Sequence, residues 1–188
     1  LSASALTVTA TTILEVDATP VITGPVDLPG SFKADGGVNN ASLTIANSGN
    51  TTFDPGANTF SALAKTAAGT LTIQKPISVE TSFTQAAGAG QLIFGGNTVT
   101  VTTGGGVVTL DNISAPGLFT FNGAVALSTN AGVSLSGGLR VQTGATTLAD
   151  DLSVSTITVD AGGAQLDASA GNNFAITATG SVNFGSST

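Results

Sequence analysis

The sequence predicts an all-β fold, specifically a parallel β-solenoid. Short triplets of apolar, polar and apolar residues recur through the chain, and Gly, Asn, Ser or Asp separates almost every triplet from the next. Period-two alternation is typical of short, half-buried strands, and no stretch carries the period of an amphipathic helix. Clear triplets are Leu71–Ile73, Val99–Val101, Val133–Leu135, Leu139–Val141, Leu152–Val154 and Ile157–Val159.

The spacing of the triplets indicates how the strands stack. From the triplet centred on Thr120 to the one on Arg140 is 20 residues, from Ser134 to Ser153 is 19, and from Arg140 to Thr158 is 18. A turn of about twenty residues, built from two or three short strands and tight corners, is typical of a parallel solenoid. Dividing 188 residues by 20 predicts about nine coils, and stacking them ~4.8 Å apart makes a rod roughly 40 Å long.

The N-terminal part is expected to be less regular than the rest. Four of the six prolines stand at positions 20, 25, 29 and 55, and proline cannot donate a ladder hydrogen bond. We expect strands at Leu6–Thr12 and Ile13–Val16 within a less regular segment 1–35, all in a single domain over residues 1–188. Because the chain starts at Leu1 without an initiator Met or an apolar leader, we expect it to be part of a larger or processed protein.

Glycine clusters mark the expected corners, since Gly and Asn tolerate the positive φ that a sharp change of strand direction often requires. An antiparallel β-sandwich is the alternative fold, because it also has short strands and Gly turns. Two-residue hairpin signals are rare, however, with Asn-Gly only at Asn122–Gly123 and Asp-Gly only at Asp35–Gly36. The clusters are Gly36–Gly37, Gly95–Asn97, Gly104–Gly106, Gly137–Gly138 and Gly162–Gly163.

Composition limits the classes of function. The chain is 8% charged with a formal net charge of -7, and its four cations, Lys33, Lys65, Lys75 and Arg140, are scattered. Phosphate-binding surfaces need clustered cations, so nucleic acids and anionic membranes are disfavoured as partners. Cys and His are absent, which excludes disulfides, thiolate metal sites and histidine-based catalysis. Apolar runs are only a few residues long, so we expect no membrane-spanning segment.

Candidates for catalysis are few. Ser–Lys pairs with Lys33, Lys65 or Lys75 are formally available, but none lies in a Gly-x-Ser-x-Gly or Ser-x-x-Lys setting. The carboxylates of Asp150–Asp151, Asp160 and Asp167 could imitate the pair of a glycosidase, because β-helical enzymes often cleave polysaccharides. Such sites usually also need cations or aromatic rings to hold the sugar, and the chain has no Tyr or Trp. We interpret the carboxylates as solubilising groups at corners and assign no catalytic residue.

No metal or cofactor site is predicted. Residues 162–167 resemble half of the nonapeptide calcium repeat, but Gln165 replaces the expected glycine and Ser169 stands where an apolar residue belongs. The motif occurs once, whereas calcium in such rolls is held between successive turns. Asp150–Asp151 could hold calcium weakly, but a solvated turn is the preferred interpretation.

Two further patterns have both a structural and a functional interpretation. Thr-x-Thr runs at Thr98–Thr102, Thr156–Thr158 and Thr177–Thr179 resemble threonine rows that order water on some solenoids, but they do not recur at one coil period. We interpret them as ordinary strand residues. Eight phenylalanines on or next to triplets are expected to stack in the core rather than form a sugar-binding platform. They are Phe53, Phe60, Phe83, Phe94, Phe119, Phe121, Phe174 and Phe184.

One segment resembles a known repeat. Residues 65–73, Lys-Thr-Ala-Ala-Gly-Thr-Leu-Thr-Ile, look like the Lys-Thr-Gly-x-Gly-Thr-Leu-Thr-Leu unit of autotransporter-associated β-strand repeats, with Ala67 in place of a glycine. Over residues 71–188, the triplets and their Ser, Thr, Asn and Gly spacers are similar to filamentous-haemagglutinin-like exoproteins and autotransporter passengers. The resemblance implies a right-handed β-helix displayed outside a bacterial cell. It carries over no functional residue, since those repeats are scaffolds.

Together these observations predict a non-enzymatic extracellular protein of a bacterial cell surface, structural or adhesive in role, that can self-assemble into filaments or a layer. Its expected partners are copies of itself, or glycans and proteins of a cell surface, with no cofactor. If the chain polymerises, the segment Leu6–Val16 is the candidate strand that adds to a neighbour, provided that it is not packed on its own coils. A carbohydrate-active β-helix enzyme and an ice-binding module are the alternatives.

Overall fold

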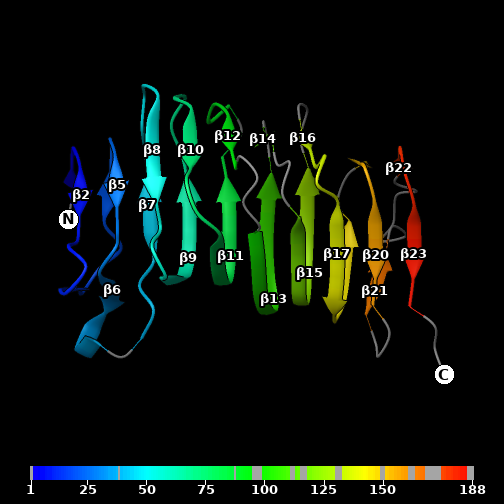
Figure 1. Ribbon diagram of the computed structural model, residues 1–188, viewed down its shortest axis with the longest axis horizontal. Coiled ribbons are helices and arrows are strands. Elements are labelled where there is room, and N and C mark those ends of the chain that lie inside the picture. Colours follow the sequence, from blue (N-terminus) through cyan, green and yellow to red (C-terminus); the bar gives the residue numbers. More distant parts are fainter. Residues whose placement is uncertain are drawn as a thin grey trace.

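The computed structural model describes residues 2–37, 39–86, 88–94, 99–110, 113–114, 118–129, 133–148, 151–160, 164–167 and 175–185. This part of the chain is almost entirely β, with one short 3₁₀ turn, η1 (Asp35–Gly37). Short strands lie side by side in a row from β2 (Leu6–Thr7) near the N-terminus to β23 (Val182–Phe184) near the C-terminus (Figure 1). The molecule is a β-solenoid, as the sequence predicts.

Most strands belong to two sheets. The long sheet contains β1 (Ser2–Ala3), β4 (Val21–Ile22), β7 (Leu43–Ile45), β9 (Thr59–Lys65), β11 (Ile77–Gln85), β13 (Val99–Leu110), β15 (Phe119–Thr129), β17 (Leu139–Thr143), β18 (Ala145–Leu148), β20 (Ile157–Val159), β21 (Gln165–Asp167) and β23. The second sheet contains β2, β5 (Val26–Asp27), β8 (Thr51–Asp54), β10 (Leu71–Ile73), β12 (Leu92–Ile93), β14 (Ile113–Ser114) and β16 (Val133–Ser134). Two further pairs are β3 (Ile13–Val16) with β6 (Ser31–Ala34), and β19 (Leu152–Val154) with β22 (Ile176–Ala178).

Neighbouring strands of these sheets pair in parallel, which confirms the solenoid over the antiparallel sandwich. Leu43 pairs with Leu63 and Leu63 with Phe83, and each step is 20 residues long. Val141 pairs with Val159, a step of 18 residues. These steps agree with the predicted turn length, and the winding is right-handed, as the resemblance implies.

The two sheets together enclose about six turns, fewer than the roughly nine coils that the sequence predicts. The second sheet runs unbroken from β2 to β16. Beyond it, β19 and β22 pair as a separate two-stranded sheet, and the single bridge from Leu135 to Val154 connects them to the preceding coil. The C-terminal turns are therefore continued mainly by the long sheet, through β17, β20 and β23.

The long strands change register partway, so the long sheet forms two sides of the solenoid. The shifts lie between Val79 and Ser82 in β11, and between Gly104 and Gly106 in β13. The first face comprises β3 and β6, the parts of β9, β11, β13 and β15 before the shift, and then β17, β20 and β23. The second face comprises β1, β4, β7, the parts after the shift, β18 and β21. The second sheet, followed by β19 and β22, forms the third face.

Inward side chains from the three faces make one apolar core. The rings of Phe83, Phe94 and Phe119 contact one another, with centroids 6.0 Å apart for Phe83–Phe94 and 5.8 Å for Phe94–Phe119. Six of the eight phenylalanines expected in the core are buried there: Phe53, Phe60, Phe83, Phe94, Phe119 and Phe121. Phe174 lies outside the described residues. Phe184 is 72% exposed, so the expectation is wrong for this residue, because it lies on β23 at the end of the long sheet.

The N-terminal segment is packed on the solenoid. β3 forms at Ile13–Val16 as predicted, but residues 6–12 form a strand only at Leu6–Thr7, because the Thr12 N–H closes a turn onto the carbonyl of Thr9 at 2.9 Å. β2 pairs with β5 and β3 with β6. The hypothesis that Leu6–Val16 adds as a strand to a neighbouring molecule is therefore wrong, since the segment completes its own coil.

The corners stack closely. A Cβ on Gly56 would lie 1.9 Å from the carbonyl oxygen of Leu28, and a Cβ on Gly69 would lie 2.1 Å from that of Gly49. Gly56 also has a φ of +58°, which L side chains rarely adopt. Close stacking of backbone on backbone is therefore what requires glycine at Gly69, and both conditions hold at Gly56.

The predicted corner glycines have mixed outcomes. Gly36, Gly37 and Gly138 have positive φ, as expected for turns. Gly104–Gly106 instead lies within β13 at its register shift, where an irregularity lets the strand bend from one face to the next. Gly95–Asn97 and Gly162–Gly163 lie outside the described residues.

Four Gly→Ala substitutions separate backbone strain from steric conflict between coils. Gly49 has open space and no positive φ, Gly36 has only the positive φ, Gly69 has only the close approach, and Gly56 has both. We expect the free energy of unfolding, measured by urea titration, to change by under about 0.5 kcal/mol for Gly49→Ala and to fall by about 1 kcal/mol for Gly36→Ala. Gly69→Ala should cost about 2 kcal/mol or more, and Gly56→Ala the most. Equal stabilities of Gly69→Ala and Gly49→Ala would contradict the corner stacking.

Candidate functional site

A shallow surface hollow of about 410 Å³ lies at the corner between the third and first faces. Thr59, Ser78 and Thr100 are register partners on β9, β11 and β13, so they bring three hydroxyl-bearing side chains to it from successive coils. The Pro55–Asn58 corner, which follows β8, and Lys75, which follows β10, place the remaining polar groups at or beside the hollow. The lining residues are Gly56, Ala57, Asn58, Thr59, Lys75, Pro76, Ile77, Ser78 and Thr100.

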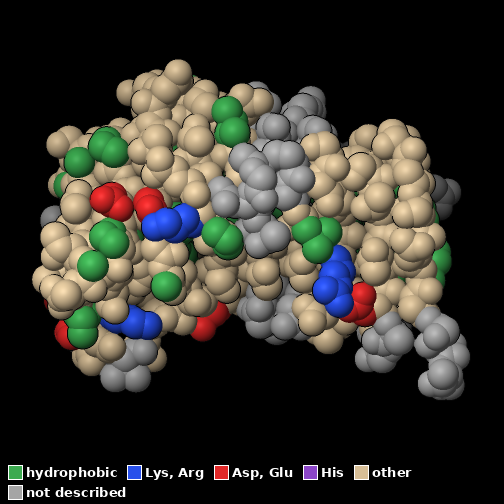
Figure 2. Space-filling view, viewed as in Figure 1, with side chains coloured by type: hydrophobic (Ala, Val, Ile, Leu, Met, Phe, Trp, Pro, Cys, Tyr) green, Lys and Arg blue, Asp and Glu red, His purple; other side chains and the backbone are tan. Residues whose placement is uncertain are grey.

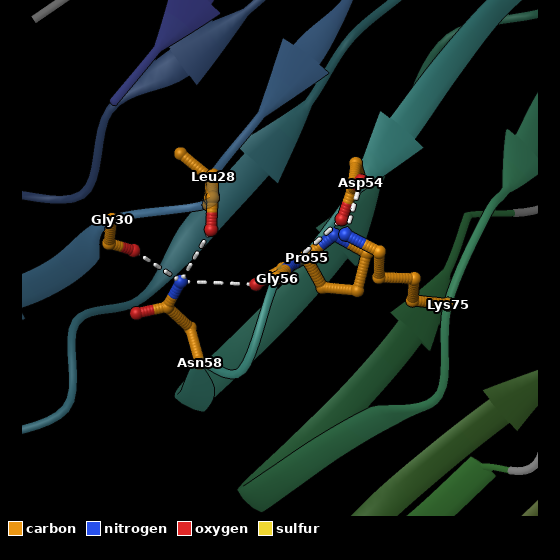
Figure 3. Close-up of polar contacts among 7 residues, drawn as sticks. All are labelled: Leu28, Gly30, Asp54, Pro55, Gly56, Asn58 and Lys75. Carbon is orange, nitrogen blue, oxygen red and sulfur yellow. Dashed lines mark hydrogen bonds and ion pairs between the residues drawn. The ribbon is translucent and has the colours of Figure 1, made fainter. Parts of the chain in front are cut away.

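Asn58 ties this corner to the coil before it (Figure 3). Its side-chain Nδ2 donates to the carbonyl oxygens of Leu28 at 3.1 Å, of Gly30 at 2.9 Å and of Pro55 at 2.9 Å. Its Oδ1 accepts a hydrogen bond from the backbone N–H of Phe32 at 2.8 Å. Both ends of the amide are therefore engaged by the protein's own backbone, and the side chain works as a clamp between coils.

Asp54 and Lys75 form an ion pair beside the hollow, with Nζ 2.7 Å from Oδ2 (Figure 3). Asp54 Oδ1 also accepts a hydrogen bond from the Gly56 N–H at 2.8 Å. Burial alone would raise the pKa of Asp54, but the hydrogen bonds from Lys75 and Gly56 and the charge of Lys75 outweigh it, and the pKa lies below its usual value. A carboxyl group that is ionised so readily is a poor general acid at neutral pH.

A second polar group lies inside the corner between the second and third faces. Asn47, Lys65 and Gln85 are buried there, and Lys65 and Gln85 are register partners on β9 and β11. Burial lowers the pKa of Lys65. Their side chains donate to corner carbonyls: Asn47 to Gly49 and Thr70, Lys65 to Ala67 and Ala89, and Gln85 to Gly90. This cluster satisfies backbone acceptors that the turns leave inside the solenoid.

The segment that resembles the autotransporter-associated repeat, residues 65–73, contributes to the same corner. Lys65 is buried, Gly69 lies against the coil before it, and Leu71 and Ile73 point into the core. The spacing of these residues therefore has a physical basis in how one corner packs on the next. Each of them has a structural role in the coil.

All four basic side chains of the chain have a partner. Lys33 Nζ donates to Asn40 Oδ1 at 2.9 Å, and Arg140 Nη2 lies 2.6 Å from Asp160 Oδ2. The hydrogen bond and charge of Asp160 raise the pKa of Arg140. Figure 2 shows that basic and acidic side chains on this face of the molecule lie next to each other, within a surface formed mainly of uncharged polar side chains and backbone.

The candidate carboxylates have structural partners. Asp160 follows β20 on the first face and binds Arg140. Asp151 precedes β19 on the third face, and its Oδ1 accepts a hydrogen bond from the Ala175 N–H at 2.7 Å. Asp167 ends β21 on the second face. Asp150 lies outside the described residues, and the side chain of Asp167 is not described. The structure thus places Asp151 and Asp160 on different faces.

For the metal and membrane hypotheses, the structure gives two findings. Among the residues it describes, no group of three or more His, Cys, Asp or Glu side chains is placed to hold a metal ion. In the same residues, no helix has the length and hydropathy needed to cross a membrane. Gly162–Gly163 of the calcium-like motif lies outside the described residues, and the last three positions of that motif form β21.

Outward hydroxyls line up only in part. On the first face, Thr59, Ser78, Thr100 and Thr120 are consecutive register partners, but the next position is Arg140, followed by Thr158. Thr177 lies on the third face, on β22. The Thr-x-Thr runs that the sequence singles out therefore belong to more than one face. Thr98 lies outside the described residues.

Reasoning from sequence missed the three polar residues with the most extensive buried or corner contacts, Asn47, Lys65 and Asn58. For Lys65 a signal exists, because it has the same phase as Leu63 in a strand and so points inward. For Asn58 the Pro55–Asn58 turn is a signal of a corner, but its partners on another coil depend on the register. Asn47 lies in a Ser/Asn/Gly-rich loop with no distinguishing pattern.

Comparison of the chain with protein families, with curated proteins and with solved structures gives no match.

The Asp54–Lys75 pair predicts part of the acid sensitivity. Because the pKa of Asp54 is lower in the folded state than its ordinary value of 3.8, its contribution to stability is present above that value and is lost as the pH falls through the folded pKa. Asp54→Asn should reduce the free energy of unfolding at about pH 7 by up to ~1 kcal/mol and reduce its further fall toward about pH 3. Urea titrations at several pH values measure this.

Lys75→Gln is the matched control for this experiment. It should lower the stability near pH 7 in the same way, and the double variant should be no less stable than the additive pair, because both changes remove one interaction. An unchanged acid dependence in Asp54→Asn would show that the pair contributes nothing to it.

Proposed function

We propose that the chain is a non-enzymatic structural or adhesive rod of a bacterial cell surface, acting outside the cell. The single observation that supports this most is how the described polar side chains are used. Asn58 and Asp54 fasten a corner, Asn47 and Lys65 satisfy buried carbonyls, and Arg140 binds Asp160 on the next coil. These groups hold coils together.

The outer surface is consistent with a scaffold. Its outward strand positions carry mainly Thr, Ser and Asn, which keep a weakly charged chain in solution through hydroxyl and amide groups. In a solenoid, stability is approximately a sum over coils and the contacts between them, so the same unit can be repeated to build length. A repeated unit of this kind serves an extended rod that displays its sides to partners.

The likeness of residues 65–73 to the autotransporter-associated repeat supports the extracellular location of the proposal. The buried and corner positions that the motif occupies here are those that a repeated coil needs. The partners that fit this proposal are other copies of the chain and the glycans or proteins of a cell surface.

The test uses the organism that encodes the chain. We expect antibodies against the chain to label intact cells, and deletion of the gene to reduce cell aggregation or attachment. Complementation with Asp151→Asn or Asp160→Asn should restore the behaviour, because in this proposal neither carboxylate performs chemistry. The purified chain should release no reducing ends from polysaccharides.

Two results would contradict the proposal. One is a chain that added protease and antibody reach only after the cells are lysed. The other is release of sugar from a polysaccharide by the wild-type chain but not by a folded Asp151→Asn or Asp160→Asn variant, which would indicate the carbohydrate-active enzyme instead.

A further inference from the structure

We propose that the last coil of one molecule binds the first coil of another, so that copies of this chain join head to tail. The inference rests on the proposed structural role and names its partner as a second copy. Four features of the two end coils support it: exposed apolar side chains, matching strand edges, matching side-chain phase and matching backbone phase.

Exposed apolar side chains gather at the ends of the rod. Four large hydrophobic residues are exposed in the part of the chain that the structure describes: Ile13 at 63%, Ile176 at 39%, Val182 at 46% and Phe184 at 72%. Ile13 lies on β3 in the first coil, and the other three lie on β22 and β23 in the last coil. The sides of the rod carry none of them, which points to the ends as the binding surfaces.

The strand edges of the two ends match. β1, β2 and β3 are the first strands of the second, third and first faces, and β21, β22 and β23 are the last strands of the same faces. Each presents an edge whose strand direction is that of the rest of its sheet. A second copy displaced along the rod axis places β21 against β1, β22 against β2 and β23 against β3, all in parallel. A pairing of two identical ends would reverse the direction of one set of strands.

The side-chain phase also matches on the first face. Val182 and Phe184 are register partners of the buried Ile157 and Val159, so they continue the inward column of the core. At the other end, Leu14 and Val16 are the register partners of Phe32 and Ala34 and pack against the same core. Both pairs are two residues apart. Val182 can therefore stack on Leu14, and Phe184 on Val16, with every inward side chain remaining inward.

The backbone groups are in phase in this register. The Ser31 N–H donates to the Thr12 carbonyl, so alternation directs the N–H and C=O groups of Ile13 and Glu15 to the open edge of β3. The Gly185 N–H donates to the Val159 carbonyl, so alternation directs those of Val182 and Phe184 to the open edge of β23. These two sets face each other when Val182 lies opposite Leu14, as in the pairing of β20 with β23.

Charge does not oppose the contact. The first coil carries Glu15 and Asp17, whereas residues 175–185 of the last coil contain no charged residue. No like charges therefore meet at the joint. One contact of this kind buries the exposed apolar residues of both ends and pairs both sets of edges, which is why a second copy is the occupant that fits. Because the joint is heterologous and leaves one free end on each side, it produces linear filaments.

The test is the association of the purified 188-residue chain, followed by sedimentation velocity and by electron microscopy. We expect concentration-dependent linear oligomers one solenoid wide. Phe184→Lys should weaken the association roughly tenfold or more, because a charged side chain replaces a large apolar one that the joint buries. Ser153→Lys, the same charge change at an exposed position on a side of the rod, is the matched control and should leave the association unchanged.

A mixing experiment tests the head-to-tail geometry. Ile13→Pro removes an N–H from the open edge of β3 and so blocks the first coil, while Phe184→Lys blocks the last coil; Glu15→Pro is a second variant for the first coil. Each variant should be monomeric alone, with its fold checked by circular dichroism. An equimolar mixture of one variant of each kind should form a one-to-one dimer and no longer species, since one intact head and one intact tail remain.

Three outcomes would overturn the proposal. They are a wild-type chain that stays monomeric, as when further coils of a longer chain cover its ends; oligomers of the first-coil variant alone, which would show pairing of identical ends; and association of Phe184→Lys equal to that of Ser153→Lys. A monomeric chain that still labels and attaches cells would overturn the joint and leave the proposed function intact.

Discussion

The structure depends on parallel stacking of one coil on the next. No coil is complete by itself, because its inward side chains and its corner carbonyls find their partners on the neighbouring coils. Phe83 contacts Phe94 and Phe119, which come from later coils, and the carbonyls of Leu28 and Gly30 bind Asn58 on the coil after them. The same dependence explains why a Cβ at Gly56 or Gly69 would overlap the backbone of the preceding coil.

This constraint also explains where the polar residues lie. A sharp corner turns carbonyl groups away from the sheet ladders, and a buried carbonyl without a donor is costly. Asn47, Lys65 and Gln85 supply those donors inside one corner, and Asn58 supplies them at another. Groups with chemical potential, including a buried lysine and an ionised aspartate, are thereby committed to holding coils together. The interpretation of the chain as a scaffold follows from that commitment, and at the two end coils the same stacking has no further partner within the described chain.

Most of the fold could be predicted from the sequence, because it is encoded locally. The alternation in Leu71–Ile73 or Ile157–Val159 is visible in three residues, and the step between coils repeats closely enough to give the turn length. What depends on register could not be predicted. Asn58 is recognisable as a corner residue, but nothing near it in the sequence indicates Leu28 or Gly30 as its partners. Gly104–Gly106 looked like a corner and lies within a strand, because a bend in a long strand and a turn between two strands require the same residue type.

Pulsed electron spin resonance between nitroxide pairs tests the parallel stacking most directly, and the absence of native cysteine makes the labelling specific. Thr59, Thr158 and Asn183 point outward on the first face, and the register places Thr158 five coils and Asn183 six coils from Thr59. At ~4.8 Å per coil, the backbone separations should be about 24 Å for Thr59–Thr158 and about 29 Å for Thr59–Asn183. A distance from Thr59 that does not increase from residue 158 to residue 183 would contradict the solenoid, and with it the account of the corners and the ends.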